Sequence, residues 1–398
     1  MTDSTQSLER LVERCVDVIS PDELAERLRL GRPLRIKLGI DPSGPMLHLG
    51  HAVVLRKLRD FQDAGHQAIL IVGDFTARIG DPTGLSNARK PRSPEEIRAD
   101  MQSYAEQAGL ILDMQKTVVR YNSEWLAPLS FADVIGLAGK ITVARMLERD
   151  DFTKRFQSGS PIGLHEFLYP LSQAYDSVAI QADIELGGTE QLFNLMVGRR
   201  LQEESGLAPQ ICMTLPILEG TDGVQRMGKS LNNYIALREA PAQMFGKAMS
   251  IPDKLITRYF RLATTLAAPE CDKIESQLER GELLPRDAKV RLAQEIVATY
   301  HGAEAARAAR EHFEKTVVRK ELPDDIAEHR VAADGKPVSL GKLLALVGWA
   351  SSNREAQRLV EQGAIKIDGQ RADDVRREEV SWSGKVLQKG NHQFIRLV

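Results

Sequence analysis

Two histidines, His48 and His51, stand at the ends of the tetrad HLGH and could bind an anion together. Residues 35–41, before the tetrad, alternate apolar with other side chains as a half-buried strand does. After the tetrad, apolar residues recur at helical spacing until Gly65. Free N–H groups and the helix dipole favour phosphate at a helix N-terminus, where imidazole adds hydrogen-bond donors without a fixed charge. The tetrad therefore predicts a phosphate site between a strand and a helix.

A metal site is the alternative use of a histidine pair, and it needs further ligands at suitable spacing. Neither an HExxH pattern nor a third ligand accompanies the tetrad, so we expect no protein-held metal. Cys15, Cys212 and Cys271 are scattered and lack CxxC spacing. The cysteines therefore indicate neither a disulfide framework nor zinc.

A basic segment, RMGKS, lies far downstream and follows a turn at residues 221–223. Its two cations, Arg226 and Lys229, could hold the negative charge of a polyphosphate. By itself the segment fits a solvated basic turn equally well. Its place after the tetrad in the chain favours a shared role in binding phosphates.

The elements that position these residues form a βαβ unit. The continuous apolar run at residues 68–72 is typical of a buried parallel strand, and the helix after the tetrad would connect it to residues 35–41. In open parallel sheets, ligands bind at the carboxyl ends of the strands. We therefore expect an α/β fold with a Rossmann-like parallel sheet and a ligand site at that edge.

Polar segments between the tetrad and the basic segment could form a second part of the site. A turn, GDPTG, occupies residues 80–84. In the segment YPLSQAYD, the side chains of Tyr169, Gln173 and Asp176 share one helix face at i, i+4 and i+7 spacing. Such side chains suit an apolar core poorly, although a solvated helix face has the same pattern. Two glycines in LGGTEQ, residues 186–191, indicate a close approach of the backbone to another group.

Both phosphate-binding segments resemble the signatures of the class I aminoacyl-tRNA synthetases, usually His-Ile-Gly-His and Lys-Met-Ser-Lys-Ser. A histidine tetrad alone also occurs in nucleotidyltransferases that adenylate small molecules. The polar segments, in their order, resemble those of the bacterial-type tyrosyl-tRNA synthetases, and the resemblance runs through nearly the whole chain. It implies activation of L-tyrosine with ATP and transfer of tyrosine to the 3′-terminal adenosine of tRNA(Tyr).

The resemblance implies three groups of site residues. The catalytic group would be His48, His51, Ser43, Lys229, Arg226 and Arg89. The ATP-binding group would be Gly39, Asp41, Gly50, Gly188, Glu190, Met227 and Ser230. The tyrosine-binding group would be Lys37, Asp81, Tyr169, Gln173, Asp176 and Gln191.

Within the tyrosine group, the resemblance implies that Asp81, Tyr169 and Gln173 hold the substrate ammonium. Gln191 would lie near the substrate carboxylate, and Asp176 would accept the phenolic O–H. The case for Asp176 also stands on physical grounds, because a buried carboxylate is satisfied only by a donor and phenylalanine offers none. On the ATP side, Glu190 would reach the ribose.

Three positions depart from the family pattern in the substrate pocket. Many relatives have tyrosine where this chain has Lys37, and a lysine there could donate to the substrate phenol or turn away. Glu190 replaces the usual aspartate and is one methylene longer. Leu85 stands where relatives often carry a mobile lysine, while Arg89 matches a second basic position and Lys90 could compensate.

The implied reaction needs no protein nucleophile. The tyrosine carboxylate would attack the α-phosphate of ATP in line, and pyrophosphate would leave with Mg²⁺ bridging its oxygens. Catalysis would then be positioning and electrostatic stabilisation of the growing charge. Arg226 replaces the first lysine of the second signature and Gly228 its middle serine; arginine keeps the charge but presents a planar fork. His51 would hold the nucleotide rather than move a proton.

Composition limits the class of protein. The 398 residues carry a formal net charge of −2 at pH 7, so an RNA site must be a local basic patch. No run approaches the ~20 apolar residues of a membrane span, and the N-terminus lacks the apolar segment of a signal peptide. We expect a cytoplasmic protein without a membrane partner. The length indicates two or three domains.

The C-terminal tail resembles the αL RNA-binding domain shared with a ribosomal small-subunit protein. Its helix carries the pattern SNREAQRLV, in which Asn353 stands where serine is usual. Residues 337–398 contain ten lysines and arginines against seven acidic residues, a balance of +3. RNA contacts would come from Arg354, Arg358 and Lys366, although a solvated surface could carry the same charges.

These observations predict a member of the bacterial-type tyrosyl-tRNA synthetases, acting as a homodimer with an insertion at residues 125–165 near the interface. A tryptophan-activating relative is the first alternative, disfavoured by the tail and by the YxxxQxxD helix. A non-enzymatic RNA-binding protein with a degenerate synthetase fold is the second, kept open by Lys37, Leu85 and Arg226. The predicted parts are a catalytic domain at residues 1–235 and an α-helical anticodon-side domain at residues 236–322. A linker at residues 323–336 and a small α+β RNA-binding domain at residues 337–398 would follow.

Overall fold

The computed structural model describes residues 8–42, 44–82, 94–319, 326–331, 337–390 and 393–398. Its chain divides into two compact units. The first comprises residues 1–239 and 247–300, and the second comprises residues 240–246 and 301–398. In the described part of the chain, no helix is both long and apolar enough to cross a membrane.

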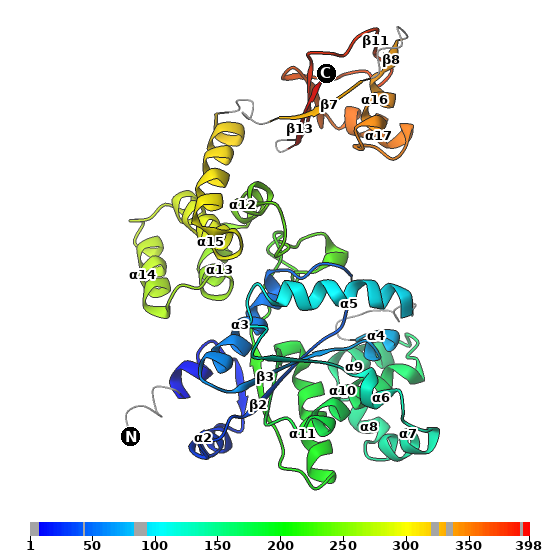
Figure 1. Cartoon of the computed structure of the whole chain (residues 1–398), viewed down its shortest axis with the longest axis vertical. Coiled ribbons are helices and arrows are strands. Elements are labelled where there is room, and N and C mark those ends of the chain that lie inside the picture. The colour runs from blue at the N-terminus through cyan, green and yellow to red at the C-terminus, as the bar shows by residue number, and fades with distance from the viewer. Residues whose placement is uncertain (1–7, 43, 83–93, 320–325, 332–336, 391–392) are drawn as a thin grey trace. The chain divides into compact units, whose positions relative to one another are not determined.

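A six-stranded sheet lies at the centre of the first unit (Figure 1). The strand order is β1-β6-β5-β2-β3-β4, and all neighbours are parallel except β1 and β6. The chain runs outward from β2 in both directions, which makes the β2–β5 boundary the topological switch point. The predicted Rossmann-like α/β fold is confirmed. The strands are β1 (Asp17–Ile19), β2 (Arg35–Ile40), β3 (Gln67–Val72), β4 (Thr117–Tyr121), β5 (Ile184–Gly188) and β6 (Ile211–Leu215).

The predicted βαβ unit is formed by β2, α3 (Leu49–Asp63) and β3. The apolar stripe of α3, which includes Leu55, Leu58 and Phe61, is completely buried against the sheet. Gly65 follows the helix with a φ of 87°, a conformation that glycine adopts without strain. This packing places the HLGH tetrad at the carboxyl end of β2.

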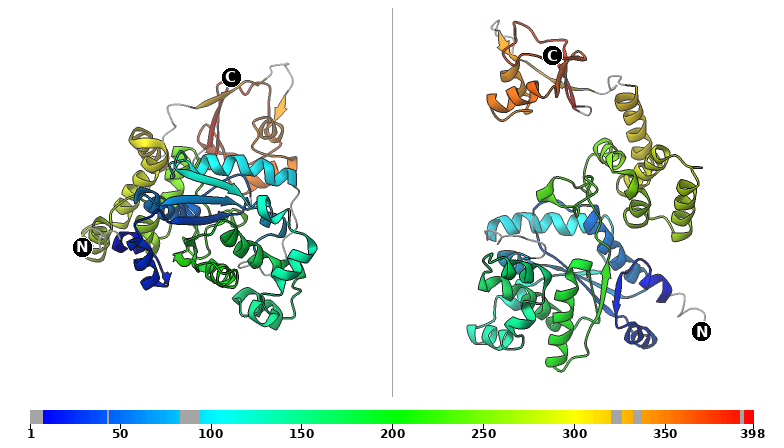
Figure 2. Two further views of the ribbon diagram at one scale, coloured as in Figure 1. Left: turned by 60° about the horizontal axis from the view of Figure 1, so that its bottom comes forward. Right: turned by 180° about the vertical axis from the view of Figure 1, so that it is seen from behind.

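Helices flank the sheet on both faces, with α3 on one side and α10 and α11 on the other (Figure 2). The predicted YPLSQAYD helix is α10 (Leu168–Ala179), and it packs against α11 (Leu192–Glu204). Between β3 and α10 the chain adds further helices, most of them short. These are α4 (Thr76–Ile79), α5 (Pro94–Ala108), α6 (Ser123–Leu126), α7 (Phe131–Ala138), α8 (Val143–Met146) and α9 (Asp150–Gln157).

The helical patterns predicted after residue 236 are confirmed. Gly302 interrupts the longest of these helices with a φ of 87°, so its two halves are separate helical runs. The predicted boundary of the helical domain at residue 322 stays a prediction. The helices are α12 (Pro241–Ser250), α13 (Ile256–Ala263), α14 (Ala268–Glu279) and α15 (Pro285–Phe313).

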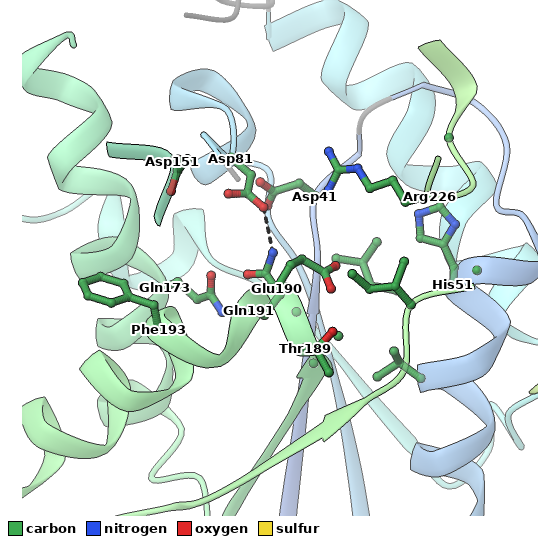
Figure 3. A pocket seen from close by; sticks show the side chains of 18 of the residues that line it. Asp41, His51, Asp81, Asp151, Gln173, Thr189, Glu190, Gln191, Phe193 and Arg226 are labelled. Carbon is green, nitrogen blue, oxygen red and sulfur yellow. Dashed lines mark hydrogen bonds between the residues drawn. The ribbon is translucent and has the colours of Figure 1, made fainter. Parts of the chain in front are cut away.

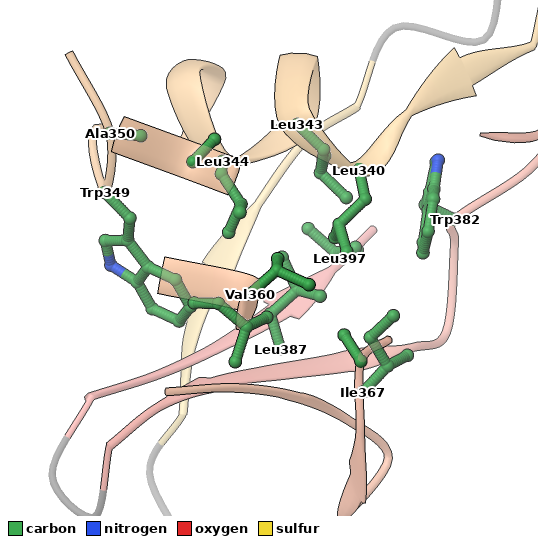
Figure 4. Packing of buried hydrophobic residues seen from close by; sticks show 13 residues of the cluster. Leu340, Leu343, Leu344, Trp349, Ala350, Val360, Ile367, Trp382, Leu387 and Leu397 are labelled. Carbon is green, nitrogen blue, oxygen red and sulfur yellow. The ribbon is translucent and has the colours of Figure 1, made fainter. Parts of the chain in front are cut away.

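A small α+β fold occupies the C-terminal part of the second unit, around one apolar core (Figure 4). Its main sheet has the order β10-β9-β12-β13-β7, and Ser352 caps the second helix by accepting the N–H of Glu355. Leu340, Leu344 and Trp382 are among the buried core residues. Its elements are β7 (Ala327–His329), β8 (Val338–Ser339), α16 (Leu340–Leu346), α17 (Asn353–Glu361), β9 (Ile365–Ile367), β10 (Gln370–Arg371), β11 (Glu378–Glu379), β12 (Val386–Lys389) and β13 (Gln393–Leu397).

One strand of this fold comes from the segment interpreted as a linker. β7 lies within residues 323–336 and pairs in parallel with β13 through Ala327, Glu328 and His329. The three residues of β7, Ala-Glu-His, are too few to show an apolar alternation in the sequence. The tail fold therefore begins before residue 337.

Candidate active site

A cleft of about 1620 Å³ lies at the carboxyl ends of β2 and β5, at the switch point of the sheet (Figure 3). Its lining includes the end of β2, the start of α3, the end of β5, one face of α10, residues between 149 and 160, and residues 216–218 and 225–231. Most of the predicted site residues lie around this one cleft. They are Gly39, Asp41, His48, Gly50, His51, Asp81, Tyr169, Gln173, Asp176, Gly188, Glu190, Gln191, Arg226, Met227, Lys229 and Ser230.

The two signature histidines are neutral hydrogen-bonding groups at the start of α3. The backbone N–H of His48 donates to Nδ1 of His51 at 3.2 Å, which leaves the proton of His51 on Nε2. Burial, with the positive charge of Lys229 as a further cause, lowers the pKa of His51 to about 3. Burial also lowers the pKa of His48 well below its usual range. Nδ1 of His48 is buried and has no hydrogen-bond partner among the described residues, so it can serve a ligand.

Gly50, the third residue of the tetrad, lies between the ring of His48 and Met227 of the basic segment. A Cβ at this position would lie 3.0 Å from two ring atoms of His48 and 3.7 Å from Cβ of Met227. Any larger residue would therefore crowd the imidazole and narrow the cleft. This close contact explains why the third residue of the tetrad is glycine.

The basic segment places its two cations at the cleft. The Nζ of Lys229 donates to Oη of Tyr104 at 2.7 Å and to the carbonyl of Gly44 at 3.1 Å. These contacts tie the segment to α5 and to the loop after β2. Arg226 extends into the cleft on the side of His51 (Figure 3). Both cations are therefore positioned beside the tetrad, as the paired signatures predict.

Asp41 is the centre of a fixed hydrogen-bond array. Its carboxylate accepts the hydroxyl of Tyr169 at 2.9 Å and the hydroxyl of Thr76 at 2.7 Å. A Cβ at Gly73 would lie only 2.0 Å from Oδ1 of Asp41, so this approach requires glycine. Because the Tyr169 hydroxyl donates its proton to Asp41, its oxygen can still accept from a substrate ammonium.

Asp176 is a buried carboxylate with two donors from the region after β4. Nε1 of Trp125 donates to Oδ1 at 2.8 Å, and Nδ2 of Asn122 lies 3.4 Å from Oδ2. Burial is the largest cause that raises the pKa of Asp176 to about 7, and the positive charge of Lys37 opposes this rise. A ligand donor such as a phenolic O–H would stabilise the ionised form.

Lys37 lies behind the cleft and does not line it. Its completely buried ammonium forms an ion pair with Glu185 at 2.8 Å and donates to Ser177 at 2.7 Å and to the carbonyl of Gln173 at 2.8 Å. These contacts use all three donors of the ammonium. Of the two orientations that the sequence allows, Lys37 therefore adopts the one turned away from the cleft.

The remaining residues of the tyrosine group face the cleft around Asp81. Nε2 of Gln191 donates to Oδ2 of Asp81 at 2.9 Å (Figure 3). Nε2 of Gln173 donates to Glu185 at 3.2 Å, behind the cleft, which leaves the amide oxygen of Gln173 as the acceptor on the cleft side. Asp81 and Gln173 thus both offer oxygen atoms to the cleft, where a cation could bind.

Glu190 offers an acceptor to a nucleotide. Its Oε2 is buried without a hydrogen-bond partner in the described residues, and burial raises the pKa of its carboxyl group. A Cβ at Gly188 would lie 2.3 Å from this oxygen. The second glycine of LGGTEQ therefore permits the carboxylate to fold back over the strand end.

Two predicted catalytic residues, Ser43 and Arg89, lie outside the described residues, as do the variant positions Leu85 and Lys90. Conversely, the sequence reading missed Asn122, Trp125 and Arg149, which contact predicted site residues. Their position gives a partial signal for the first two, because Asn122 directly follows β4 at the ligand-binding edge of the sheet. No local pattern marks Arg149.

A model of the family described as "tRNA synthetases class I (W and Y)" matches residues 29–318, and a model of the S4 domain matches residues 338–378. The first match covers more than half of the chain. The chain belongs to this family of class I tRNA synthetases. The S4 match agrees with the αL-type RNA-binding fold predicted for the tail.

Bacterial relatives of this synthetase cover nearly its whole length. It is 52% identical to the tyrosine--tRNA ligase of Thermotoga maritima over 97% of this chain and 96% of the relative. It is 51% identical to the tyrosine--tRNA ligase of Moorella thermoacetica, over 98% of this chain and 95% of the relative. It is 53% identical to the tyrosine--tRNA ligase of Carboxydothermus hydrogenoformans, over 93% of this chain and 92% of the relative.

Solved structures share the fold of this synthetase at lower identity. A tyrosyl-tRNA synthetase from Archaeoglobus fulgidus, complexed with L-tyrosine, matches with a TM-score of 0.64 and 22% identity, over 77% of this chain and 100% of that one. A C-terminally truncated mitochondrial tyrosyl-tRNA synthetase from Aspergillus nidulans matches with a TM-score of 0.63 and 24% identity, over 77% and 93%. These two matches concern the fold alone.

Proposed function

We propose that this chain is a tyrosine--tRNA ligase, which activates L-tyrosine with ATP and transfers tyrosine to the 3′-terminal adenosine of tRNA(Tyr). The observation that carries the proposal is one cleft with two sides of different chemistry. The relatives that are about half identical over nearly the full length are named tyrosine--tRNA ligases. The amino-acid side consists of Asp81, Tyr169, Gln173, Asp176 and Gln191, and the nucleotide side of His48, His51, Glu190, Arg226 and Lys229.

On the amino-acid side, Asp176 selects tyrosine. Its carboxylate accepts the phenolic O–H of the substrate, while Trp125 and Asn122 hold it in place. Phenylalanine would leave the buried carboxylate without that donor, which costs binding energy. The oxygen atoms of Asp81, Tyr169 and Gln173 receive the ammonium, and Gln191 lies near the carboxylate.

On the nucleotide side, the residues stabilise charge that develops on pyrophosphate. The tyrosine carboxylate attacks the α-phosphate, the bond from phosphorus to the bridging oxygen breaks, and pyrophosphate leaves. Neutral His48 and His51 donate to phosphate oxygens, and the cations Arg226 and Lys229 balance the β- and γ-phosphates. Glu190 accepts a ribose hydroxyl. Mg²⁺ enters with ATP as part of the substrate.

Further ATP contacts come from small or buried residues around the same cleft. Gly39 and Gly50 let the nucleotide approach the backbone, and Asp41 lines the same cleft. Ser43 and Arg89 belong to the proposed catalytic group on the strength of the family pattern alone. The other members of the proposed ATP-binding group are Gly188, Met227 and Ser230.

We also propose a homodimer whose interface includes the insertion at residues 125–165. This segment exposes large apolar side chains, each more than half exposed, which favours burial against a partner of the same kind. Sedimentation velocity would test the proposal, and a charged replacement at Phe131 should produce monomers. A monomeric wild-type chain at micromolar concentration would contradict it. The exposed side chains are Phe131, Ile135, Val143, Phe156 and Leu164.

The tail is proposed to bind tRNA through Arg354, Arg358 and Lys366. Arg354 and Arg358 are exposed one turn apart on α17, so they present two cations on one face. Lys366 lies on β9 of the same fold.

ATP–pyrophosphate exchange with each amino acid, followed by charging of tRNA(Tyr), tests the function. We expect exchange that depends on tyrosine. Exchange that depends on tryptophan would identify the tryptophan-activating alternative. RNA binding without exchange for any amino acid would identify a non-enzymatic protein.

A further inference from the structure

A closed hydrogen-bond ring connects the buried Arg149 to the amino-acid side of the cleft. Nη2 of Arg149 contacts Oδ1 of Asp81 at 3.3 Å, and its Nη1 donates to Oδ1 of Asn194 at 3.2 Å. Nδ2 of Asn194 donates to Oε1 of Gln191 at 2.9 Å. Nε2 of Gln191 then donates to Oδ2 of Asp81 at 2.9 Å. Both arms of the ring therefore end on the carboxylate of Asp81, one on each oxygen.

The chemistry of the two ends sets the direction of the ring. A guanidinium only donates hydrogen bonds, and a carboxylate only accepts them. The two amides between them, Asn194 and Gln191, must therefore each accept on the Arg149 side and donate on the Asp81 side. Turning either amide over would place two donors or two acceptors face to face. Arg149 and Asp81 thereby favour the same orientation of Gln191, with Nε2 facing Asp81.

Burial makes this arrangement rigid. The side chain of Arg149 is 4% exposed, and Asn194 is 1% exposed. Outside the ring, Nε of Arg149 donates to Oδ1 of Asp151 at 2.7 Å, and the guanidinium carbon lies 5.2 Å from the centre of the Phe152 ring. Both Arg149 and Asp81 line the cleft, but the side chain of Asp81 is more exposed, at 20%. The ring thus runs from a nearly buried cation at the wall of the cleft to a carboxylate that is more exposed to a ligand.

We propose that Arg149 is a positioning residue for amino-acid recognition: through the two arms of the ring it orients the carboxylate of Asp81 to receive the substrate ammonium. This inference rests on the proposed function and assigns a role to a residue that neither signature contains. Each of the three nitrogens of Arg149 contacts a protein acceptor, and the proposed role is exerted through the contact with Asp81.

Two substitutions break the ring without changing the charge of the site. Arg149→Lys keeps the positive charge, but an ammonium cannot span Asp81 and Asn194 as a planar fork does. Asn194→Leu keeps the approximate volume and removes the link between Arg149 and Gln191. Arg200→Lys is the matched control on α11, because Arg200 is 61% exposed and pairs only with Glu204 among the described acidic residues.

The test measures binding of three ligands by equilibrium dialysis: L-tyrosine, tyramine, which lacks the carboxylate, and 3-(4-hydroxyphenyl)propionate, which lacks the ammonium. Arg149→Lys should weaken L-tyrosine and tyramine by about tenfold each, the size of a lost hydrogen bond to a charged group. Binding of 3-(4-hydroxyphenyl)propionate and of ATP should change by less than about twofold. Asn194→Leu should show the same ligand pattern with a smaller factor, and Arg200→Lys should change nothing.

Several results would overturn the proposal. A loss for L-tyrosine and 3-(4-hydroxyphenyl)propionate with tyramine unchanged would make Arg149 a direct carboxylate ligand. An equal loss of affinity for all three ligands would show that Arg149 has a general structural role. Unchanged affinities in Arg149→Lys would show that only the positive charge of residue 149 matters, and not its hydrogen-bond geometry. If one variant does not fold, the other still decides between these results. A wild-type chain that binds no tyrosine would overturn the proposed function itself, whereas unchanged variants of a tyrosine-binding chain would overturn this inference alone.

Discussion

The amino-acid side and the nucleotide side of the cleft are built in opposite ways. On the amino-acid side, Asp176 and Asp81 are carboxylates whose oxygens already accept protein donors. On the nucleotide side, His48 and Glu190 keep buried atoms without partners in the described residues. The difference reflects two tasks. Selecting one amino acid requires a fixed array, whereas accelerating adenylate formation requires groups whose hydrogen bonds are completed as charge develops.

The comparison predicts a large loss of stability when the buried ion pair behind the amino-acid side, Lys37 with Glu185, is broken. Lys37→Met should leave Glu185 as an uncompensated buried charge and lower the free energy of unfolding by about 3–5 kcal/mol. Adding Glu185→Met to the same chain should restore much of this loss. Urea unfolding measures both. Lys116→Met, at a side chain that is 72% exposed, is the control and should change stability by less than about 0.5 kcal/mol.

On the nucleotide side, removal of single groups should affect catalysis and not tyrosine binding. His48→Ala or Lys229→Ala should lower kcat for adenylate formation by about 10²–10³-fold, the effect of losing one preorganised group that stabilises developing charge. Rapid-quench measurements of adenylate formation give kcat, and equilibrium dialysis gives tyrosine affinity. A large loss of tyrosine affinity with kcat intact would mean that the two sides have been interchanged.

On the amino-acid side, specificity should change and ATP use should not. Asp176→Asn should reduce the tyrosine-to-phenylalanine ratio of kcat/KM by about 10- to 100-fold, because the phenolic O–H loses its charged acceptor. The KM for ATP should stay nearly constant. Pyrophosphate exchange with both amino acids measures the ratio, and an unaltered ratio would refute the assignment of Asp176.

The two sides of the cleft should also differ in their contribution to the pH dependence of kcat/KM. Since burial raises the pKa of Asp176 to about 7, kcat/KM for tyrosine should fall by about tenfold per pH unit below 7, as the carboxylate is protonated in the free enzyme. The facing charges are Lys37 on β2, which lowers this pKa, and Glu185 on β5, which raises it. The depressed pKa values of His48 and His51 predict no contribution from them in this range. The decline should be absent in Asp176→Asn, and its persistence there would assign it to another group.

The smallest effect should come from the tail, which neither side of the cleft requires. Replacing Arg354 and Arg358 together by glutamate should leave tyrosyl-adenylate formation within about twofold of wild type. Charging should fall at sub-saturating tRNA, and the salt dependence of tRNA binding should decrease by up to about one phosphate contact for each arginine. Filter binding across a salt series measures this slope. Unchanged charging and slope would exclude this face of α17 as an RNA contact.

Local sequence patterns were sufficient for the βαβ unit, for α10 and for the helices after residue 236. The alternation in β2, the helical stripe of α3 and the turn at residues 221–223 before RMGKS each depend on residues close in sequence, so each can be recognised locally. The same locality explains why the two signatures and the shared face of Tyr169, Gln173 and Asp176 could be recognised. Which acceptors these side chains meet could not be recognised in this way.

Tertiary structure alone decided the orientation of Lys37, the donors of Asp176 and the ring that starts at Arg149. Lys37 turns from the cleft because β5 brings Glu185 beside β2, and the pairing of these distant strands is not encoded in either one. Arg149 reaches Asp81 across an intervening 67 residues, through contacts that exist only when α9, α11 and the strand ends are packed together. Local periodicity specifies which face of an element is buried, but the partner of a buried polar group is set by whichever distant element supplies the missing charge or hydrogen bond.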